Sequence, residues 1–289
     1  DYDLLRDRVI FPIRDNQGRT IGFGGRALDD EVKPKYINSS DSPVFHKQHV
    51  LYGYYESRQK RANDWLVVEG YMDVVALTQS DIHNAVATLG TATSAPHVQK
   101  LFRFTDTIVF SFDGDSAGRK AAWRAMTNAL PYTSDTRTIK FLFLPPEHDP
   151  DSFVREFGAD KFNAQISTAM TLSEFLLYGL KQAAPEANAE ARARQLNLAK
   201  PLLQAMPNNA LRTQIIQAIA EQLRISSNDV IDYAELVTNQ RPAKRGIEKS
   251  KRSQPLSAVE QALRLILEHH GIAAHANLNL WARQPRHQA

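Results

Sequence analysis

The chain has 289 residues, of which 43% are hydrophobic and 23% are charged, and it contains no cysteine. This ordinary globular composition allows a sizeable core, and the absence of cysteine excludes a disulfide framework, a thiol nucleophile and a cysteine-ligated metal site. The formal net charge is +3, but the segment 241–255 alone carries six basic residues and one acidic residue, so the remainder of the chain is slightly acidic.

The first 60 residues predict a β-rich segment followed by a basic, aromatic stretch. Residues 8–13 and 19–23 are apolar runs on either side of an Asn/Gly turn, a pattern typical of a β-hairpin. Gly24 and Gly25 follow at once, where the backbone needs conformational freedom. Between residues 33 and 60, lysine and arginine are interleaved with tyrosine and phenylalanine.

From about residue 64 the sequence predicts strands that alternate with helices. The expected strands are 66–68, 85–89, 107–112 and 139–144, and the expected helices are 71–79, 94–104 and 116–130. Such alternation predicts a parallel sheet covered by crossover helices. After Asp151 the strand signal stops. Amphipathic helices are then expected at 151–169, 171–183, 187–206, 209–224 and 228–239.

The carboxyl-terminal part predicts a linker and the beginning of a further module. Because 241–255 contains two prolines, a glycine and few apolar residues, a solvated linker is favoured over a nucleic-acid patch. Ser257 to Glu260 then form a capping box that begins a helix over 258–270. The whole chain lacks an apolar run near the roughly 18 residues of a membrane span and a signal-peptide pattern, so we expect a cytoplasmic protein without a membrane partner.

Acidic residues follow three of the predicted strands. The six side chains are Glu69, Asp73, Asp113, Asp115, Asp149 and Asp151. In an open α/β sheet ligands bind beyond the carboxyl ends of the strands, so these carboxylates are expected on one rim. Like charges gathered there raise each other's pKa or require a cation. Mg²⁺ accepts carboxylate oxygens and leaves positions for phosphate, so the pattern predicts a magnesium site.

Each acidic string also has a simpler explanation when it is taken alone. Asp113-Gly114-Asp115 is more often a turn than a metal site, and Asp149 or Asp151 can cap a helix that begins near residue 152. A Glu-Gly pair after a strand is common. The metal interpretation is favoured because all three strings occur at strand ends of one sheet, in the order Glu, Asp-x-Asp, Asp-Pro-Asp.

These strings resemble the Toprim domain of bacterial DNA primases. The resemblance rests on Val67-Val68-Glu69-Gly70-Tyr71-Met72-Asp73-Val74, Phe112-Asp113-Gly114-Asp115-Ser116-Ala117-Gly118 and Asp149-Pro150-Asp151. Upstream, 8–13, 22–26, 34–39 and 45–53 are similar to the core subdomain of the same family, and the resemblance extends over roughly 6–240. It implies an α/β fold in which a Toprim-type parallel sheet with flanking helices follows a mixed α+β basic subdomain and precedes an all-α subdomain.

The resemblance also implies a domain order. The expected parts are the carboxyl-terminal portion of the core's first subdomain at 1–62, the Toprim catalytic domain at 63–151, a helical subdomain at 152–240, a flexible basic linker at 241–256 and the start of a helicase-interaction domain at 257–289. The family's zinc ribbon has no counterpart here, because the chain has no cysteine. Zinc is therefore expected only in a module absent from this chain, and Asp1 as first residue suggests a piece of a longer protein.

The implied activity is that of a DNA-directed RNA polymerase, a nucleotidyltransferase that makes short RNA primers on single-stranded DNA for replication. The 3′-hydroxyl of one ribonucleotide attacks the α-phosphate of the next and pyrophosphate leaves, with Mg²⁺, or Mn²⁺ in its place, neutralising charge. The implied metal ligands are Glu69, Asp113, Asp115, Asp149 and Asp151. Of these, Glu69, Asp113 and Asp115 are expected to be catalytic, and Asp73 to be a ligand or to support one.

Basic residues upstream match positions at which the family grips template or nucleotide. They are Arg26, Lys35 and Lys47, whose charges suit phosphates. Taken without the resemblance, each would be interpreted as a solvated surface charge. The implied partners are a single-stranded DNA template, ribonucleoside triphosphates, the replicative helicase through the carboxyl-terminal module, and single-strand-binding protein.

Two other classes of function remain open at this stage. Another Toprim enzyme, a topoisomerase or an OLD-type nuclease, would share the carboxylates. A topoisomerase also needs a nucleophilic tyrosine on a separate module, whereas most tyrosines here lie within 36–71. A non-catalytic Toprim scaffold that binds DNA is the other alternative, and such a scaffold could lose the acidic residues that this chain keeps.

Overall fold

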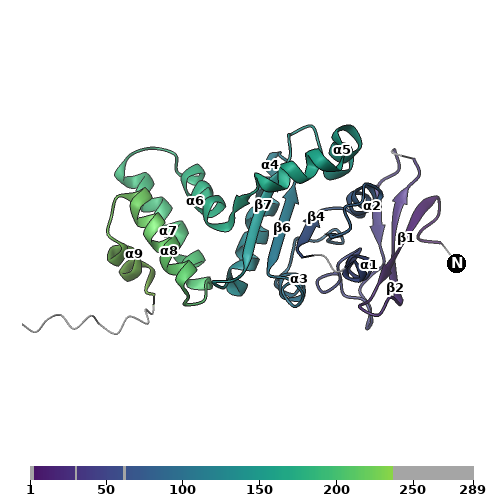
Figure 1. The fold of residues 1–289 in the computed structure, drawn as a ribbon, viewed down its shortest axis with the longest axis horizontal. Helices are drawn as coiled ribbons and strands as arrows, with labels where there is room; N and C mark the ends of the chain where they lie inside the picture. Colours follow the sequence, from purple (N-terminus) through teal and green to yellow (C-terminus); the bar gives the residue numbers. More distant parts are fainter. Residues whose placement is uncertain (1–2, 30, 61–62, 237–289) are drawn as a thin grey trace, which may run out of the picture. The chain divides into compact units, whose positions relative to one another are not determined.

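A five-stranded sheet has the strand order β5-β4-β6-β7-β8. Its strands β4, β6 and β7 lie in the middle of the view in Figure 1. The computed structural model describes residues 3–29, 31–60 and 63–236, which belong to the first of the chain's two units, Asp1–Thr238. The strands are β4 (Trp65–Val68), β5 (Ala85–Ala87), β6 (Thr107–Phe112), β7 (Thr138–Phe143) and β8 (Met170–Thr171). The first four pair in parallel, and β8 pairs antiparallel with β7 at the edge.

Helices cover both faces of this sheet, which explains why its strands are almost continuously apolar. On one face, α2 (Tyr71–Gln79) and α5 (Pro150–Ser167) pack against Leu66, Val109 and Leu142. On the other face, α3 (Ala95–Leu101) and α4 (Ser116–Ala129) pack against side chains that include Phe110 and Phe141. The sheet is therefore buried on both sides, and only its strand ends are open to ligands.

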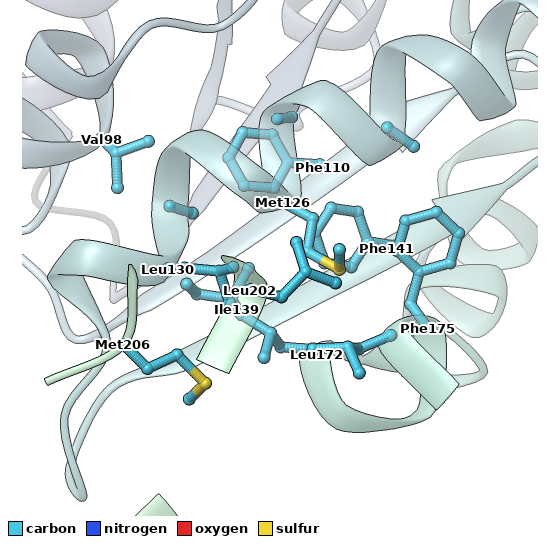
Figure 2. Packing of buried hydrophobic residues seen from close by; sticks show 14 of the residues in the cluster. Val98, Phe110, Met126, Leu130, Ile139, Phe141, Leu172, Phe175, Leu202 and Met206 are labelled. Atoms are coloured by element: carbon cyan, nitrogen blue, oxygen red, sulfur yellow. The ribbon is translucent and has the colours of Figure 1, made fainter. Parts of the chain in front are cut away.

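The carboxyl-terminal helices share the core of the second face instead of forming a core of their own. These helices are α6 (Leu172–Ala183), α7 (Ala189–Ala205), α8 (Ala210–Leu223) and α9 (Ser227–Ala234). Figure 2 shows Phe110, Phe141 and Phe175 beside Met126, with Leu202 of α7 close by. The ring centroids of Phe141 lie 5.5 Å from Phe110 and 4.7 Å from Phe175.

A smaller antiparallel sheet precedes this arrangement. It consists of β1 (Arg8–Arg14), β2 (Thr20–Ala27) and β3 (Tyr36–Asn38), followed by α1 (Tyr54–Gln59). Gly18 has a φ of 86° in the turn between β1 and β2, which favours glycine there. The ring of Phe11 lies 4.7 Å from that of Tyr71 at the start of α2, so this sheet packs against the β4–α2 junction.

The observed elements follow the predicted alternation, with three additions. The strands β3 and β8 and the helix α1 were not expected, because two- to six-residue segments carry too little periodicity to be identified from sequence. In α5 the backbone breaks at Gly158, where φ is 80°. The expected linker and the helix at 258–270 lie outside the described residues. Within the described residues, none of the helices has both the length and the apolar content needed to cross a bilayer.

A buried histidine joins the loop before α1 to helix α3. The Nδ1 atom of His97 accepts the N–H of Ser94 at 3.2 Å, and its Nε2–H donates to the carbonyl of Lys47 at 3.0 Å. These partners require a neutral ring, because a backbone N–H cannot accept a proton from Nδ1. Burial therefore lowers the pKa of His97 to about 4.

This pKa predicts a pH-dependent loss of stability. Unfolded His97 has its ordinary pKa near 6.5, so its contribution is fully present above pH 6.5 and is lost as the pH falls toward 4. Between pH 7.5 and 5, we expect wild-type unfolding free energy to fall by about 2 kcal/mol more than that of His97→Gln. Urea unfolding at the two pH values measures the difference, and equal losses in both proteins would contradict a buried neutral ring.

A second prediction concerns the shared aromatic core. Phe141→Ala should reduce the free energy of unfolding by about 3–5 kcal/mol, since the ring is fully buried between β6, α4 and α6. Leu28→Ala is the control, because Leu28 is 68% exposed and its truncation should change stability by less than about 0.5 kcal/mol. Denaturant titration measures both. An effect of Phe141→Ala as small as that of Leu28→Ala would show that the Phe141 ring does not pack in the core as described.

Candidate acidic active site

The parallel sheet brings three acidic strand ends to one edge. From β4 the chain passes to β5 on one side and later to β6 on the other, which makes the carboxyl ends of β4 and β6 a topological switch point. Glu69 follows β4 and Asp113 follows β6 at this point, and Asp149 lies in the loop after β7. Since β4, β6 and β7 are neighbours, the three residues come from adjacent strands.

The carboxylates at this edge are close enough to repel one another. Partial burial, then the neighbouring carboxylates of Asp149 and Asp115, raise the pKa of Asp113. Although the Glu69 side chain is exposed overall, desolvation of its carboxyl group and the charge of Asp113 raise the pKa of Glu69. The backbone N–H of Asp113 donates to the Glu69 carboxylate and opposes this rise. The edge therefore concentrates negative charge that a cation would relieve.

Asp73 lies under this edge and joins two of its loops. Its side chain is only 8% exposed. Its Oδ2 accepts the N–H of Gly70 at 3.0 Å, and its Oδ1 accepts the N–H of Asp151 at 3.3 Å. Burial, together with the charges of Asp149 and Asp113, raises the pKa of Asp73 to about 7. The residue thus connects the loop after β4 with the start of α5.

Asp115 and Asp149 begin helices as well as contributing charge. Asp115 Oδ1 accepts the N–H of Gly118 at 2.7 Å at the start of α4, and Asp149 Oδ1 accepts the N–H of Ser152 at 2.7 Å at the start of α5. A cap uses one oxygen of each carboxylate and fixes its direction. Asp151 forms an ion pair with Arg155, one helical turn further along α5.

The donor set of this edge suits a hard divalent cation. All of its candidate ligands are carboxylate oxygens, and their mutual repulsion gives a reason for a cation to bind. Within the described ranges, no three or more acidic or histidine side chains are placed closely enough to form a metal site. The chemistry of the residues therefore fits a cation, and binding would require their side chains to turn toward it.

The three predicted basic residues lie on the smaller sheet and in the loops beside it. Arg26 is in β2, opposite Tyr36 of β3, and Lys35 precedes β3. Lys47 lies in the loop before α1, and its own carbonyl accepts the His97 Nε2–H. The smaller sheet reaches the acidic edge through Tyr36, whose ring lies 5.2 Å from that of Tyr71.

Two further residues at this junction were not singled out from the sequence. Asn38 donates through Nδ2 to the carbonyl of Leu89 at 3.2 Å and so connects β3 with the segment after β5. Arg155 neutralises Asp151. The spacing of four residues between Asp151 and Arg155 is a signal that could have revealed the pair, whereas no pattern indicates a contact across 51 residues.

Three family models match successive parts of the chain. The DNA primase catalytic core, N-terminal domain, matches residues 1–58, and a Toprim-like model matches 66–154. The model described as the DnaB-helicase binding domain of primase matches 173–228, which falls on α6, α7 and α8. Residues 257–289, for which we expected the start of the helicase-interaction domain, lie outside the described part of the chain.

Curated and solved relatives agree with these matches. The chain is 52% identical over 232 residues to the DNA primase of Pseudomonas aeruginosa, which covers 79% of this chain but only 35% of that protein. A crystal structure of a DNA primase domain from the same species has 51% identity and a TM-score of 0.78, covering 81% of this chain and 74% of that one. A DnaG primase catalytic domain bound to single-stranded DNA has 48% identity and a TM-score of 0.75, covering 79% and 73%.

The switch-point edge and the Toprim-like match together define a Toprim-containing α/β protein, with a helical subdomain packed on one face of its sheet. The solved relative extends the likeness over the smaller sheet and the helices as well. The chain belongs to the family of bacterial DNA primases. It spans little more than a third of the length of the curated relatives that it matches.

The electrostatic coupling at the edge gives a third prediction. Asp113→Asn removes one negative charge but keeps the backbone N–H, so the pKa values of Glu69 and Asp73 should both fall. Carboxyl-carbon NMR titration in the presence of a chelator measures them. Asp81→Asn is the control, since the Asp81 side chain is 99% exposed and contributes to neither pKa. Unchanged values in Asp113→Asn would contradict the close approach of these groups.

Proposed function

We propose that this chain is the catalytic part of a DNA primase, which joins ribonucleotides on a single-stranded DNA template with release of pyrophosphate. The observation that supports this most directly is the placement of Glu69, Asp113 and Asp149 after three neighbouring parallel strands, at one edge of the sheet. A chain that is 51% identical to a solved primase domain provides the context for that edge. The reaction class, nucleotidyl transfer, is part of the proposal.

The carboxylates have distinct roles in this proposal. Asp113, Asp115, Asp149 and Asp151 would hold Mg²⁺ or Mn²⁺ with Glu69, and the bound cation would neutralise charge on the triphosphate. Asp115 and Asp149 each use one carboxylate oxygen for a helix cap. The cap holds the carboxylate in place, and the second oxygen would be free to bind the cation. Glu69 has a raised pKa, which suits a group that takes up the proton of the attacking hydroxyl.

Asp73 is proposed as a positioning residue. It accepts one hydrogen bond from the loop that carries Glu69 and one from the first turn of α5, which follows Asp149. Its buried side chain would therefore keep these two loops in register while the exposed carboxylates act on substrate. This role requires no direct contact between Asp73 and the nucleotide.

The basic residues of the smaller sheet are proposed to hold phosphate groups. Arg26, Lys35 and Lys47 lie on the part of the chain that packs against Tyr71, beside Glu69. A guanidinium can bind phosphate oxygens in a bidentate manner, and lysine supplies a point charge. A relative that is 48% identical is described as bound to single-stranded DNA, which supports single-stranded DNA as the template.

A replicative helicase is the proposed protein partner. The match of the helicase-binding model to 173–228 supports a contact through α6, α7 and α8. The expectation of a contact through 257–289 remains a proposal, as does binding of ribonucleoside triphosphates.

Primer synthesis can be tested in a chimera in which residues 1–236 replace the matching segment of the Pseudomonas aeruginosa primase. We expect the chimera to incorporate labelled ribonucleotides on single-stranded DNA and to stop when divalent cations are chelated. Asp113→Asn should lower the rate about a hundredfold or more, because loss of one charged ligand weakens the stabilisation of the transferred phosphoryl group. Asp81→Asn should keep the wild-type rate, since Asp81 is exposed and lies beyond the carboxyl end of α2, whereas Glu69 precedes the amino end of that helix.

The outcome against the proposal is equally specific. A chimera that synthesises RNA equally well with Asp113→Asn would remove the assignment of the acidic edge. Cleavage or relaxation of DNA without nucleotide addition would indicate a nuclease or a topoisomerase instead. Manganese binding by the 289-residue chain, measured by electron paramagnetic resonance and lost in Asp113→Asn, would test the cation separately.

A further inference from the structure

A pocket beside the acidic edge, on the side away from the smaller sheet, is not used by the proposed chemistry. It has a volume of about 300 Å³ and lies between β7, β8 and α6. Its lining includes Arg119, Leu142, Phe143, Met170 and Tyr178. Neither the smaller sheet nor the basic residues Arg26, Lys35 and Lys47 contribute to this lining.

The walls of the pocket combine two aromatic rings with one guanidinium. Arg119 lies over the ring of Phe143, 4.9 Å from its centroid, and over the ring of Tyr178, 5.7 Å from its centroid. Its Nη1 donates to the Tyr178 hydroxyl at 3.5 Å. In the described part of the chain no carboxylate forms an ion pair with Arg119, so its charge is held by aromatic faces and is available to an anion.

One wall of the pocket is the edge of the sheet. The short strand β8 pairs with β7 only at Lys140 and Phe141. Beyond that point, the side of β7 that faces away from β6 has no partner strand at Leu142 and Phe143 among the described residues. An unpaired strand edge presents backbone N–H and C=O groups, which can form hydrogen bonds with the polar edge of a planar ligand.

The pocket adjoins the acidic edge through Arg119 and Phe143. Arg119 lies in the first turn of α4, and its N–H donates to the carbonyl of Asp115 at 3.1 Å. Phe143 directly precedes Leu144, whose carbonyl oxygen would lie only 2.3 Å from a Cβ atom at Gly114. Four helical residues rise about 6 Å, so the Arg119 backbone is within one turn of a proposed metal ligand.

We propose that this pocket binds one unstacked base of a single-stranded nucleic acid that passes the acidic edge. A base would displace the Arg119 guanidinium from the rings of Tyr178 and Phe143 and stack there, and its polar edge would meet the backbone of β7. The displaced guanidinium would pair with the phosphate of the same nucleotide. The inference rests on the proposed function for the identity of the ligand. It adds a second nucleic-acid contact, on the opposite side of the carboxylates from Arg26, Lys35 and Lys47.

The test compares a fluorescent oligothymidylate of about 16 nucleotides with an abasic strand of the same length and charge, using the 289-residue chain. Tyr178→Leu should weaken binding of oligothymidylate about five- to a hundredfold, as for loss of one base–aromatic stack, and leave abasic binding unchanged. Arg119→Gln should weaken both and reduce the dependence on salt. Tyr233→Leu is the matched control. Tyr233 is an exposed tyrosine on α9, and the ammonium group of Lys200 from α7 lies over its ring.

Thermal unfolding of each variant separates loss of binding from loss of folding. Arg119 is exposed, so its replacement should lower the melting temperature only slightly, through the loss of its contacts with the two rings. Photo-crosslinking of an oligonucleotide with 4-thiothymidine should label Tyr178 or Phe143. Crosslinks only on the smaller sheet, wild-type affinity of Tyr178→Leu, or equal losses on the abasic strand would each overturn the pocket. Failure of the wild-type chain to bind oligothymidylate would overturn it too, whereas the chimera assay decides primer synthesis independently.

Discussion

Parallel pairing of β4, β6 and β7 is the constraint on which the acidic edge depends. Because the strands run in one direction, every residue that follows them emerges on the same side of the sheet. Carboxylates separated by tens of residues along the chain are therefore forced together and raise one another's pKa. The fold remains stable despite this repulsion, because the apolar sheet is buried between layers of helices on both of its faces.

Local interactions and the proposed chemistry use the same side chains. Asp115 and Asp149 begin α4 and α5 as helix caps, and each cap sets the direction of a carboxylate at the edge. A capping interpretation and a metal interpretation of these strings are thus compatible, although a sequence makes them look like alternatives. Asp73 extends the principle, since a buried carboxyl group holds two loops whose neighbours carry the exposed charges.

The sequence was sufficient for the alternation of strands and helices and for the common edge of Glu69, Asp113 and Asp149, because both follow from local periodicity and the direction of parallel strands. It was insufficient for contacts between distant segments. Neither the bond from Asn38 to Leu89 nor the placement of Arg119 between Phe143 and Tyr178 leaves a periodic signal. Short elements such as β8 escaped for a related reason, since two residues acquire strand geometry only from the neighbouring strand.

The continuous apolar packing from Phe110 through Phe141 to Phe175 limits how this protein can be divided. A fragment that stopped after the last acidic string would leave one face of its sheet without the helices that cover it, and an uncovered apolar face of that kind promotes aggregation. Gene fusions or expression fragments that keep only the Toprim portion would therefore need a substitute for α6 and α7.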